Sequence, residues 1–394
     1  MQRPQTLLLR HMPLDRSQRL AGFVQSDIRA MTRECERVGG INLGQGICDL
    51  PTPPAVAKAA IAAIEGGRSI YSYPEGIVEL REKVALKLAR QNGIVVDPAT
   101  QILISAGSAG AFTAVLHGLL DPGDGLLLME PYYGYHKGAA RIAGIEPQTL
   151  TLEMPGFRLT ESALRSSIRA NTKAIVVCTP GNPSGRMFDR EELLMLARVA
   201  EEHDLLVITD EIYEEIRYDD RVHLCPASLP ELADRCVTIM GLSKTFSITG
   251  WRLGYAVASP ERLRSMTLVH DLFYICAPTP LQYGVCAGFD EPPAFFESMR
   301  ADYAKKRELL CSTLERVGLS PNWPEGAYYV LADCRKLGQS SSKEAALELL
   351  RRTGVASIPG SAFYEGDGGE HLLRFCFAKQ DSELEAAVER LANL

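Results

Sequence analysis

Short apolar runs alternate with amphipathic stretches between residues 100 and 258. The apolar runs predict strands at 101–105, 125–130, 173–178, 205–210, 236–240 and 254–258. Helical spacing of apolar residues predicts helices between them, for example over 109–120 and 190–203. This alternation is typical of βαβ units, and strands that are apolar throughout indicate a mostly parallel sheet covered by helices on both faces.

The pattern changes after about residue 290. A long amphipathic helix is predicted over 293–318, and short strands such as "AYYVLADC" and "LLRFCFA" follow among short helices. We therefore predict an α/β protein with a large doubly wound domain over 51–290. A smaller α+β domain over 291–394 is expected to pack on it, together with an N-terminal arm over 1–50.

Composition narrows the class of protein. The chain has 394 residues, of which 46% are hydrophobic and 23% charged, with a formal net charge of −7. These values are typical of a globular protein and argue against a nucleic-acid partner, which requires a clustered basic face. The sequence contains no apolar stretch of eighteen residues, so no membrane partner is expected. Its ten cysteines are scattered without metal-binding spacing, which favours a reducing, cytoplasmic location and no metal.

Polar motifs follow four of the predicted strands. "SAGSAGA" follows 101–105, "TPGNPSG" follows 173–178, "TDEIYEE" follows 205–210, and "GLSKTFSITGWRLG" follows 236–240. Ligands of open α/β sheets bind beyond the carboxyl ends of the strands, so these motifs are expected to meet at one edge. Each motif also has an ordinary structural explanation: a tight turn, a Pro/Gly loop, a helix N-cap at Asp210, or a solvated basic loop.

The last motif is the most informative about chemistry. A lysine that loses its charge readily on burial is suited to form an imine, and Lys244 lies among apolar neighbours. Ser243 and Arg252 flank Lys244 and are suited to hold a phosphate by charge-assisted hydrogen bonds.

Together these motifs resemble those of the class I/II aminotransferases, the fold type I enzymes that depend on pyridoxal 5′-phosphate (PLP). The resemblance extends from "NLGQGICDLPTPP" to "LLRFCFA", and "SKTFSITGWRLG" is similar to the family's PLP-lysine signature. "YSYPEGIVELR", "PYYGY", "PGNPSG", "DEIYE" and "PGSAFYEG" occur in the family's order.

The resemblance implies catalytic roles. Lys244 would bind PLP as a Schiff base and transfer the substrate proton, and Asp210 would pair with the pyridinium nitrogen. Asn182 and Tyr213 would hydrogen-bond the phenolic oxygen of the ring, and Tyr133 would stack on the ring.

The same resemblance implies a phosphate site. The phosphate would be held by the backbone of Ser108 and Ala109 and by the side chains of Ser243 and Arg252. Tyr71 matches a tyrosine that reaches the phosphate from the neighbouring subunit, so a homodimer with shared active sites is expected.

For the substrate, the resemblance implies that Arg374 binds the α-carboxylate, with Asn182 and the Gly46 backbone beside it. The segment "GICDLPTP" departs from the family pattern, because Cys48 replaces a proline and Leu50 a phenylalanine. This segment borders the substrate, so the departure affects specificity inferred from relatives.

The donor is expected to be a neutral, bulky or aromatic L-amino acid, and a 2-oxo acid is expected to accept the amino group. Some relatives that favour acidic substrates carry a lysine where this chain has Ala109. Tyr133, Tyr135, Phe363 and Tyr364 are candidates to line an apolar pocket. Two alternatives stay open: a PLP-dependent lyase, either a C–S β-lyase or an enzyme resembling aminocyclopropane-carboxylate synthase, and a non-catalytic PLP-binding protein.

Overall fold

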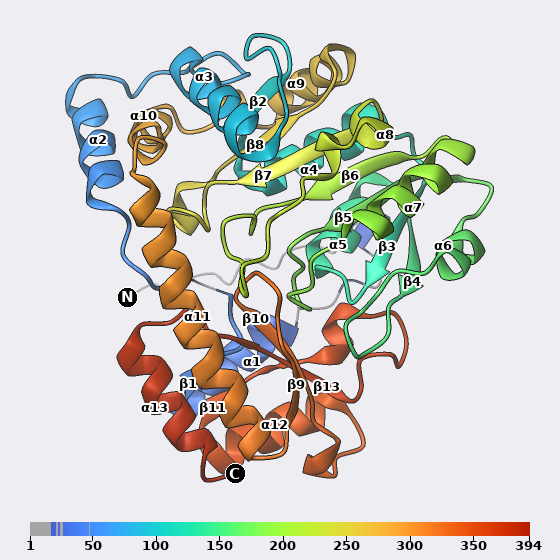
Figure 1. Ribbon diagram of the computed structural model, residues 1–394, viewed down its shortest axis with the longest axis vertical. Helices are drawn as coiled ribbons and strands as arrows, with labels where there is room; N and C mark the ends of the chain where they lie inside the picture. Colours follow the sequence, from blue (N-terminus) through green and yellow to red (C-terminus); the bar gives the residue numbers. More distant parts are fainter. Residues whose placement is uncertain (1–16, 21–22, 24–26, 47) are drawn as a thin grey trace, which may run out of the picture.

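The large sheet of the computed structural model contains seven strands in the order β2-β8-β7-β6-β5-β3-β4 (Figure 1). The structure describes residues 17–20, 23, 27–46 and 48–394, so the predicted arm over 1–50 lies partly outside the described residues. The strands are β2 (Ile102–Ala106), β3 (Gly125–Glu130), β4 (Glu146–Thr151), β5 (Thr172–Cys178), β6 (Leu206–Asp210), β7 (Cys236–Gly241) and β8 (Leu253–Val257). This arrangement confirms the predicted α/β fold and all six predicted strands.

Two features of the sheet were not predicted. Strand β4 lies at the edge, where its alternating exposed and buried residues gave no continuous apolar run. Strand β8 runs antiparallel to both β2 and β7, while the other pairs are parallel. The connection from β7 to β8 contains only a short 3-10 helix, and a parallel return would need a longer crossover, usually with an α-helix.

Successive residues of the central strands pack on opposite faces of the sheet. Leu126 and Leu128 of β3 belong to one hydrophobic cluster, whereas Leu127 and Met129 belong to another. Helices cover both faces, as the alternation requires. The helices of this part of the chain are α2 (Pro54–Glu65), α3 (Val78–Lys87), α4 (Gly107–Leu119), α5 (Gly134–Ala143), α6 (Glu161–Ser167), α7 (Arg190–Glu202), α8 (Pro230–Ala233), α9 (Pro260–Tyr274) and α10 (Thr279–Gly288).

A second, smaller group of elements lies below the large sheet in Figure 1, joined to it by the long helix α11 (Pro293–Arg316). Its antiparallel sheet has the order β12-β13-β10-β9, and a separate parallel pair joins β1 to β11. The elements are β1 (Ile41–Asn42), β9 (Ser320–Asn322), β10 (Tyr329–Asp333), β11 (Val355–Ala356), β12 (Ile358–Pro359), β13 (Leu372–Cys376), α1 (Asp27–Arg37), α12 (Ser342–Thr353) and α13 (Asp381–Leu391). The pairing of β1 with β11 brings residues before 50 beside the C-terminal part, and the exact division at 51 and 290 stays a prediction.

None of the helices that the structure describes is long and apolar enough to cross a membrane. All ten cysteines are free, and the described residues contain no group of three acidic, histidine or cysteine side chains arranged to hold a metal ion.

Candidate active site

The four polar motifs meet at one edge of the large sheet. Strands β2, β5, β6 and β7 all point the same way, so their carboxyl ends lie along that edge. Asp210 is the last residue of β6, Asn182 lies in the turn after β5, and Lys244 follows β7. Ser108 lies in the first turn of α4, directly after β2. The sequence prediction that these residues converge agrees with this topology.

Asp210 is buried and only half satisfied. Its Oδ2 lies 3.0 Å from Nε2 of His136, on α5, while its Oδ1 has no partner among the described residues. No helix begins after Asp210, so the carboxylate is not an N-cap. A buried carboxylate oxygen without a donor is costly, which indicates that a ligand cation or N–H completes the site.

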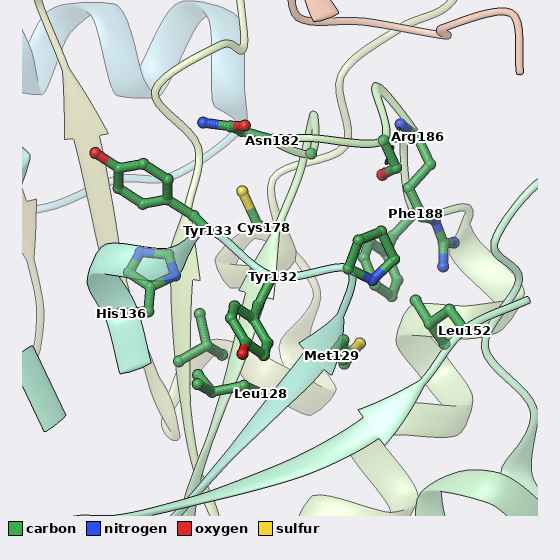
Figure 2. Close-up of a pocket in the computed structure, with 14 residues that line it drawn as sticks. Leu128, Met129, Tyr132, Tyr133, His136, Leu152, Cys178, Asn182, Arg186 and Phe188 are labelled. Carbon is green, nitrogen blue, oxygen red and sulfur yellow. Dashed lines mark hydrogen bonds between the residues drawn. The ribbon is translucent and has the colours of Figure 1, made fainter. Parts of the chain in front are cut away.

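An aromatic stack supports the histidine. The ring of Tyr133 packs edge-on against His136, with centroids 5.3 Å apart, and lies nearly parallel to Tyr135 at 5.2 Å. Figure 2 shows Tyr133, His136, Cys178 and Asn182 among the residues that line a small pocket. The Cys178 thiol remains protonated there because burial raises its pKa.

Lys244 lies in an aromatic and largely desolvated setting. Its Nζ lies 6.0 Å from the ring centroid of Tyr213 and 5.5 Å from that of Tyr328. Burial lowers the pKa of the ammonium from its ordinary value of 10.5. A neutral amine is therefore more accessible here than at a surface lysine, as imine chemistry requires.

The turn from β2 into α4 forms a cradle with Arg252. Gly107 has φ +71°, and a Cβ built on it would lie 2.7 Å from Nη2 of Arg252. A Cβ on Gly254 would lie 2.6 Å from the backbone nitrogen of Ser108, so strand β8 must also carry a glycine at this point. These two close approaches bring a guanidinium to the N-terminus of a thirteen-residue helix, an arrangement suited to bind a phosphate.

His270 supports this cradle. Its Nε2 accepts a hydrogen bond of 3.0 Å from the backbone nitrogen of Ala106, at the end of β2. Burial lowers the pKa of the His270 ring to about 4, so the ring is neutral and remains an acceptor at ordinary pH. Ser243 also lies at the cradle's edge, where its hydroxyl donates to the Leu253 carbonyl at 3.4 Å.

Arg374 comes from β13 and reaches the same site. Its Nη1 donates to Oδ1 of Asn182 at 3.1 Å, and its Nη2 donates to the carbonyl oxygen of Gly44 at 2.6 Å. Its buried Nε has no partner among the described residues. The guanidinium carbon lies 4.5 Å and 4.8 Å from the ring centroids of Tyr329 and Phe363, which hold the cation in an aromatic setting.

A cluster of tyrosines lies between the surroundings of Lys244 and those of Arg374. The Tyr213 hydroxyl, whose pKa is raised by burial, donates to the Tyr329 hydroxyl at 3.3 Å. A Cβ on Gly46 would lie 1.8 Å from that Tyr329 hydroxyl, so only glycine fits at this position. Gly46 therefore lies beside Arg374's aromatic neighbour.

Most of the predicted residues come together within the chain, but Tyr71 does not. Its side chain is 75% exposed and no described contact links it to the cradle. Sequence reasoning also missed His136, His270, Tyr328 and Tyr329. The signal for His136 was its position three residues after Tyr133, but the sequence does not show that α5 brings this side chain to the end of β6.

Comparison with known proteins identifies the family. The model of aminotransferase class I and II matches residues 38–391. The chain is 33% identical to the probable N-succinyldiaminopimelate aminotransferase of Mycobacterium tuberculosis, over 95% of this chain and 98% of that one. It is 35% identical to the aspartate aminotransferase of Pyrococcus abyssi, over 90% and 91% of the two chains.

Solved structures of aminotransferases agree with the family that the sequence comparison identifies. N-succinyldiaminopimelate aminotransferase from Mycobacterium tuberculosis superposes with a TM-score of 0.92 at 33% identity, covering 96% of this chain and 99% of that one. An Escherichia coli protein with a methionine aminotransferase function gives a TM-score of 0.93 at 28% identity, covering 97% and 100%. The chain belongs to the class I and II aminotransferases.

Proposed function

We propose that this aminotransferase uses PLP, bound at Lys244, to move an amino group from a neutral, bulky or aromatic L-amino acid to a 2-oxo acid. The observation that carries the cofactor proposal is the buried, unpartnered Oδ1 of Asp210. A protonated pyridine nitrogen would supply the missing donor. The glycine-lined cradle at Arg252 and the desolvated amine of Lys244 fit the phosphate and the aldehyde of the same molecule.

When bound, PLP supplies a conjugated cationic ring that accepts the electron pair left when a proton leaves the substrate Cα. Asp210 would keep the ring nitrogen protonated, and His136 would hold that carboxylate in place. Tyr133 would cover one face of the ring, while Asn182 and Tyr213 would hydrogen-bond its phenolic oxygen. Lys244 Nζ would take up the Cα proton and return it, as general acid–base catalysis requires.

The phosphate would lie in the cradle. The backbone N–H groups of Ser108 and Ala109 would donate to it at the start of α4, where the helix dipole favours an anion. Ser243 and Arg252 would add a hydroxyl and a charged donor.

Arg374 would bind the substrate α-carboxylate. Its contacts with Asn182 and Gly44 fix the guanidinium plane, and its unpartnered Nε leaves a donor available. The Gly46 backbone and the Asn182 amide are the other candidate contacts. This arrangement supports recognition of the group that all α-amino acids share.

The surroundings of the site favour a neutral, apolar donor. Tyr133, Tyr135 and Phe363 supply aromatic surface, and Ala109 supplies no charge. A substrate carboxylate beyond Cα would be desolvated without a cation to pair with it, which is costly. The relatives named above include an aspartate aminotransferase and a protein with a methionine aminotransferase function, so their names leave the donor open.

We expect kcat/KM for phenylalanine or methionine to exceed that for aspartate by about tenfold or more, since tenfold corresponds to only about 1.4 kcal/mol. The test follows amino transfer from single amino acids to a common 2-oxo acid and the visible absorption of the PLP-loaded protein. Aspartate as the best donor by a wide margin would contradict the preference. Release of an oxo acid without amination of the acceptor would instead favour the lyase alternative.

A homodimer with shared sites is also proposed. Large apolar side chains are exposed on α2, on the segment after it and on α9, and contiguous exposed apolar surface is typical of protein–protein interfaces. Tyr71, in the segment after α2, is then available to reach a partner's phosphate.

A cytoplasmic location is proposed on the scattered cysteine pattern alone.

Tyr71→Phe should weaken PLP retention about tenfold, since it removes one hydroxyl donor to a charged group. Tyr73→Phe is the matched control, because Tyr73 is similarly exposed at 73%. Retention is measured by dialysis against PLP-free buffer, and mass by sedimentation. Equal retention in both variants, or a monomeric wild type, would count against shared sites.

A further inference from the structure

A second cavity, of about 550 Å³, lies between α3 and the start of α11, outside the proposed active site. None of the residues proposed above to bind cofactor or substrate lines it. Cavities of this size hold ligands of small-molecule dimensions.

Two helix faces form its walls. Lys83, Leu86 and Lys87 of α3 line one side at helical spacing, and Arg90 and Gln91 continue that side. On the other side, Pro293, Phe296 and Arg300 recur at spacings of three and four along α11, so they share one face. The two helices thus present apolar and cationic groups side by side.

The cavity is amphipathic. Phe246 lies 5.9 Å from Phe289 and 6.5 Å from Phe296, centroid to centroid, and these three rings form an apolar wall. Such a wall favours a flat or branched apolar group. Phe296 and Arg300 lie one turn apart on α11, so a single ligand can contact the ring and the guanidinium together.

The charges lining the cavity are unevenly paired. Lys83 pairs with Asp290, and Lys87 pairs with Glu214. Two guanidinium groups share the one carboxylate of Glu215, from Arg300 at 3.1 Å and from Arg217 at 3.6 Å. Burial and the neighbouring Arg217 lower the pKa of the Arg300 guanidinium, a shift that a second anion would oppose.

His223 provides a separate indication. It is 8% exposed and lines the cavity, and its Nε2 lies 2.6 Å from Oε2 of the buried Glu211. Its buried Nδ1 has no partner among the described residues. Since Nε2 donates to the Glu211 carboxylate, the vacant Nδ1 is an acceptor, and buried ring nitrogens ordinarily have a partner, so a hydrogen-bond donor such as a water molecule in the cavity would complete it.

We propose that this cavity is a second ligand site, for a small organic carboxylate with an aromatic or branched apolar body. The carboxylate binds at Arg217 and Arg300, and the body lies on the phenylalanine wall. The segment at the end of β7 contributes to both the second cavity and the proposed active site. Gly241, Leu242 and Thr245 line the cavity, while Ser243 and Lys244 belong to the active site.

The test is equilibrium dialysis of the PLP-loaded protein with 3-phenylpropionate, which has neither an amino nor an oxo group. The wild type should show a binding component that Arg300→Gln weakens about tenfold or more, as loss of a charge-assisted hydrogen bond predicts. Lys305→Gln removes the same charge from an exposed position on α11 outside the cavity and should bind as the wild type does.

A second variant avoids dependence on the Arg300 ion pair. Leu86 lies at the rim and is 54% exposed, so Leu86→Trp should fold normally and obstruct the cavity. Loss of the same component in Leu86→Trp supports the site. If Arg300→Gln and Leu86→Trp both bind 3-phenylpropionate with wild-type number and affinity, the only binding is elsewhere and the proposal is overturned.

Discussion

Lys244→Ala should lower the rate of amino transfer by about four orders of magnitude or more, because one change removes both the cofactor attachment and the proton-transferring amine. No described hydrogen-bond acceptor contacts the Lys244 amine, so the variant should keep its fold. Circular dichroism and thermal unfolding check the fold. Borohydride reduction followed by mass spectrometry checks covalent cofactor attachment, which should occur in the wild type alone.

Lys244→Arg is the matched control for charge. Arginine keeps a cation at this position but stays protonated, so it neither attaches the cofactor nor accepts a proton. Both variants should therefore be inactive. Wild-type turnover in either would refute the assignment of Lys244.

The pH dependence of PLP attachment to the wild-type protein is a related prediction. Because burial lowers the Lys244 pKa, the neutral amine becomes available at a pH below 10.5. We expect the rate at which the cofactor-free protein attaches PLP to rise with pH through that ionisation, rather than to require the strongly basic solution that an exposed lysine would need.

Asp210→Asn should lower kcat by about two to three orders of magnitude, the range measured when a preorganised electrostatic group is removed from an active site. Asparagine has nearly the same shape but no negative charge, so it would not keep a pyridine nitrogen protonated. Single-turnover absorbance measurements of Cα deprotonation locate the loss in that step. A variant within twofold of the wild type would contradict the proposed role.

Stability should not follow activity in this variant. Asp210 is a buried charge with one oxygen unpartnered, and such a group adds little to stability or detracts from it. The unfolding midpoint of Asp210→Asn should equal or exceed that of the wild type in the absence of PLP.

His136→Phe leaves the carboxylate but removes the group that holds it, so its activity loss should be smaller, about tenfold.

Local pattern predicted much of the site because the chemistry lies at strand ends. Asp210, Asn182 and Lys244 each follow an apolar run, and parallel strands bring their carboxyl ends to one edge whatever the details of packing. Residues that reach the site from the side were not predictable in this way. His136 and His270 depend on how α5 and α9 pack against the sheet.

The sequence by itself determined the α/β class, the six apolar strands, the family resemblance and the order of the polar motifs, because these depend on local periodicity and residue type. The tertiary structure alone decided that β8 runs antiparallel, that Arg374 meets Asn182 and Gly44, and that Asp210 keeps one oxygen unpartnered. The reason is physical: strand direction, side-chain burial and hydrogen-bond partnership depend on groups far apart in the chain, and only packing brings those groups together.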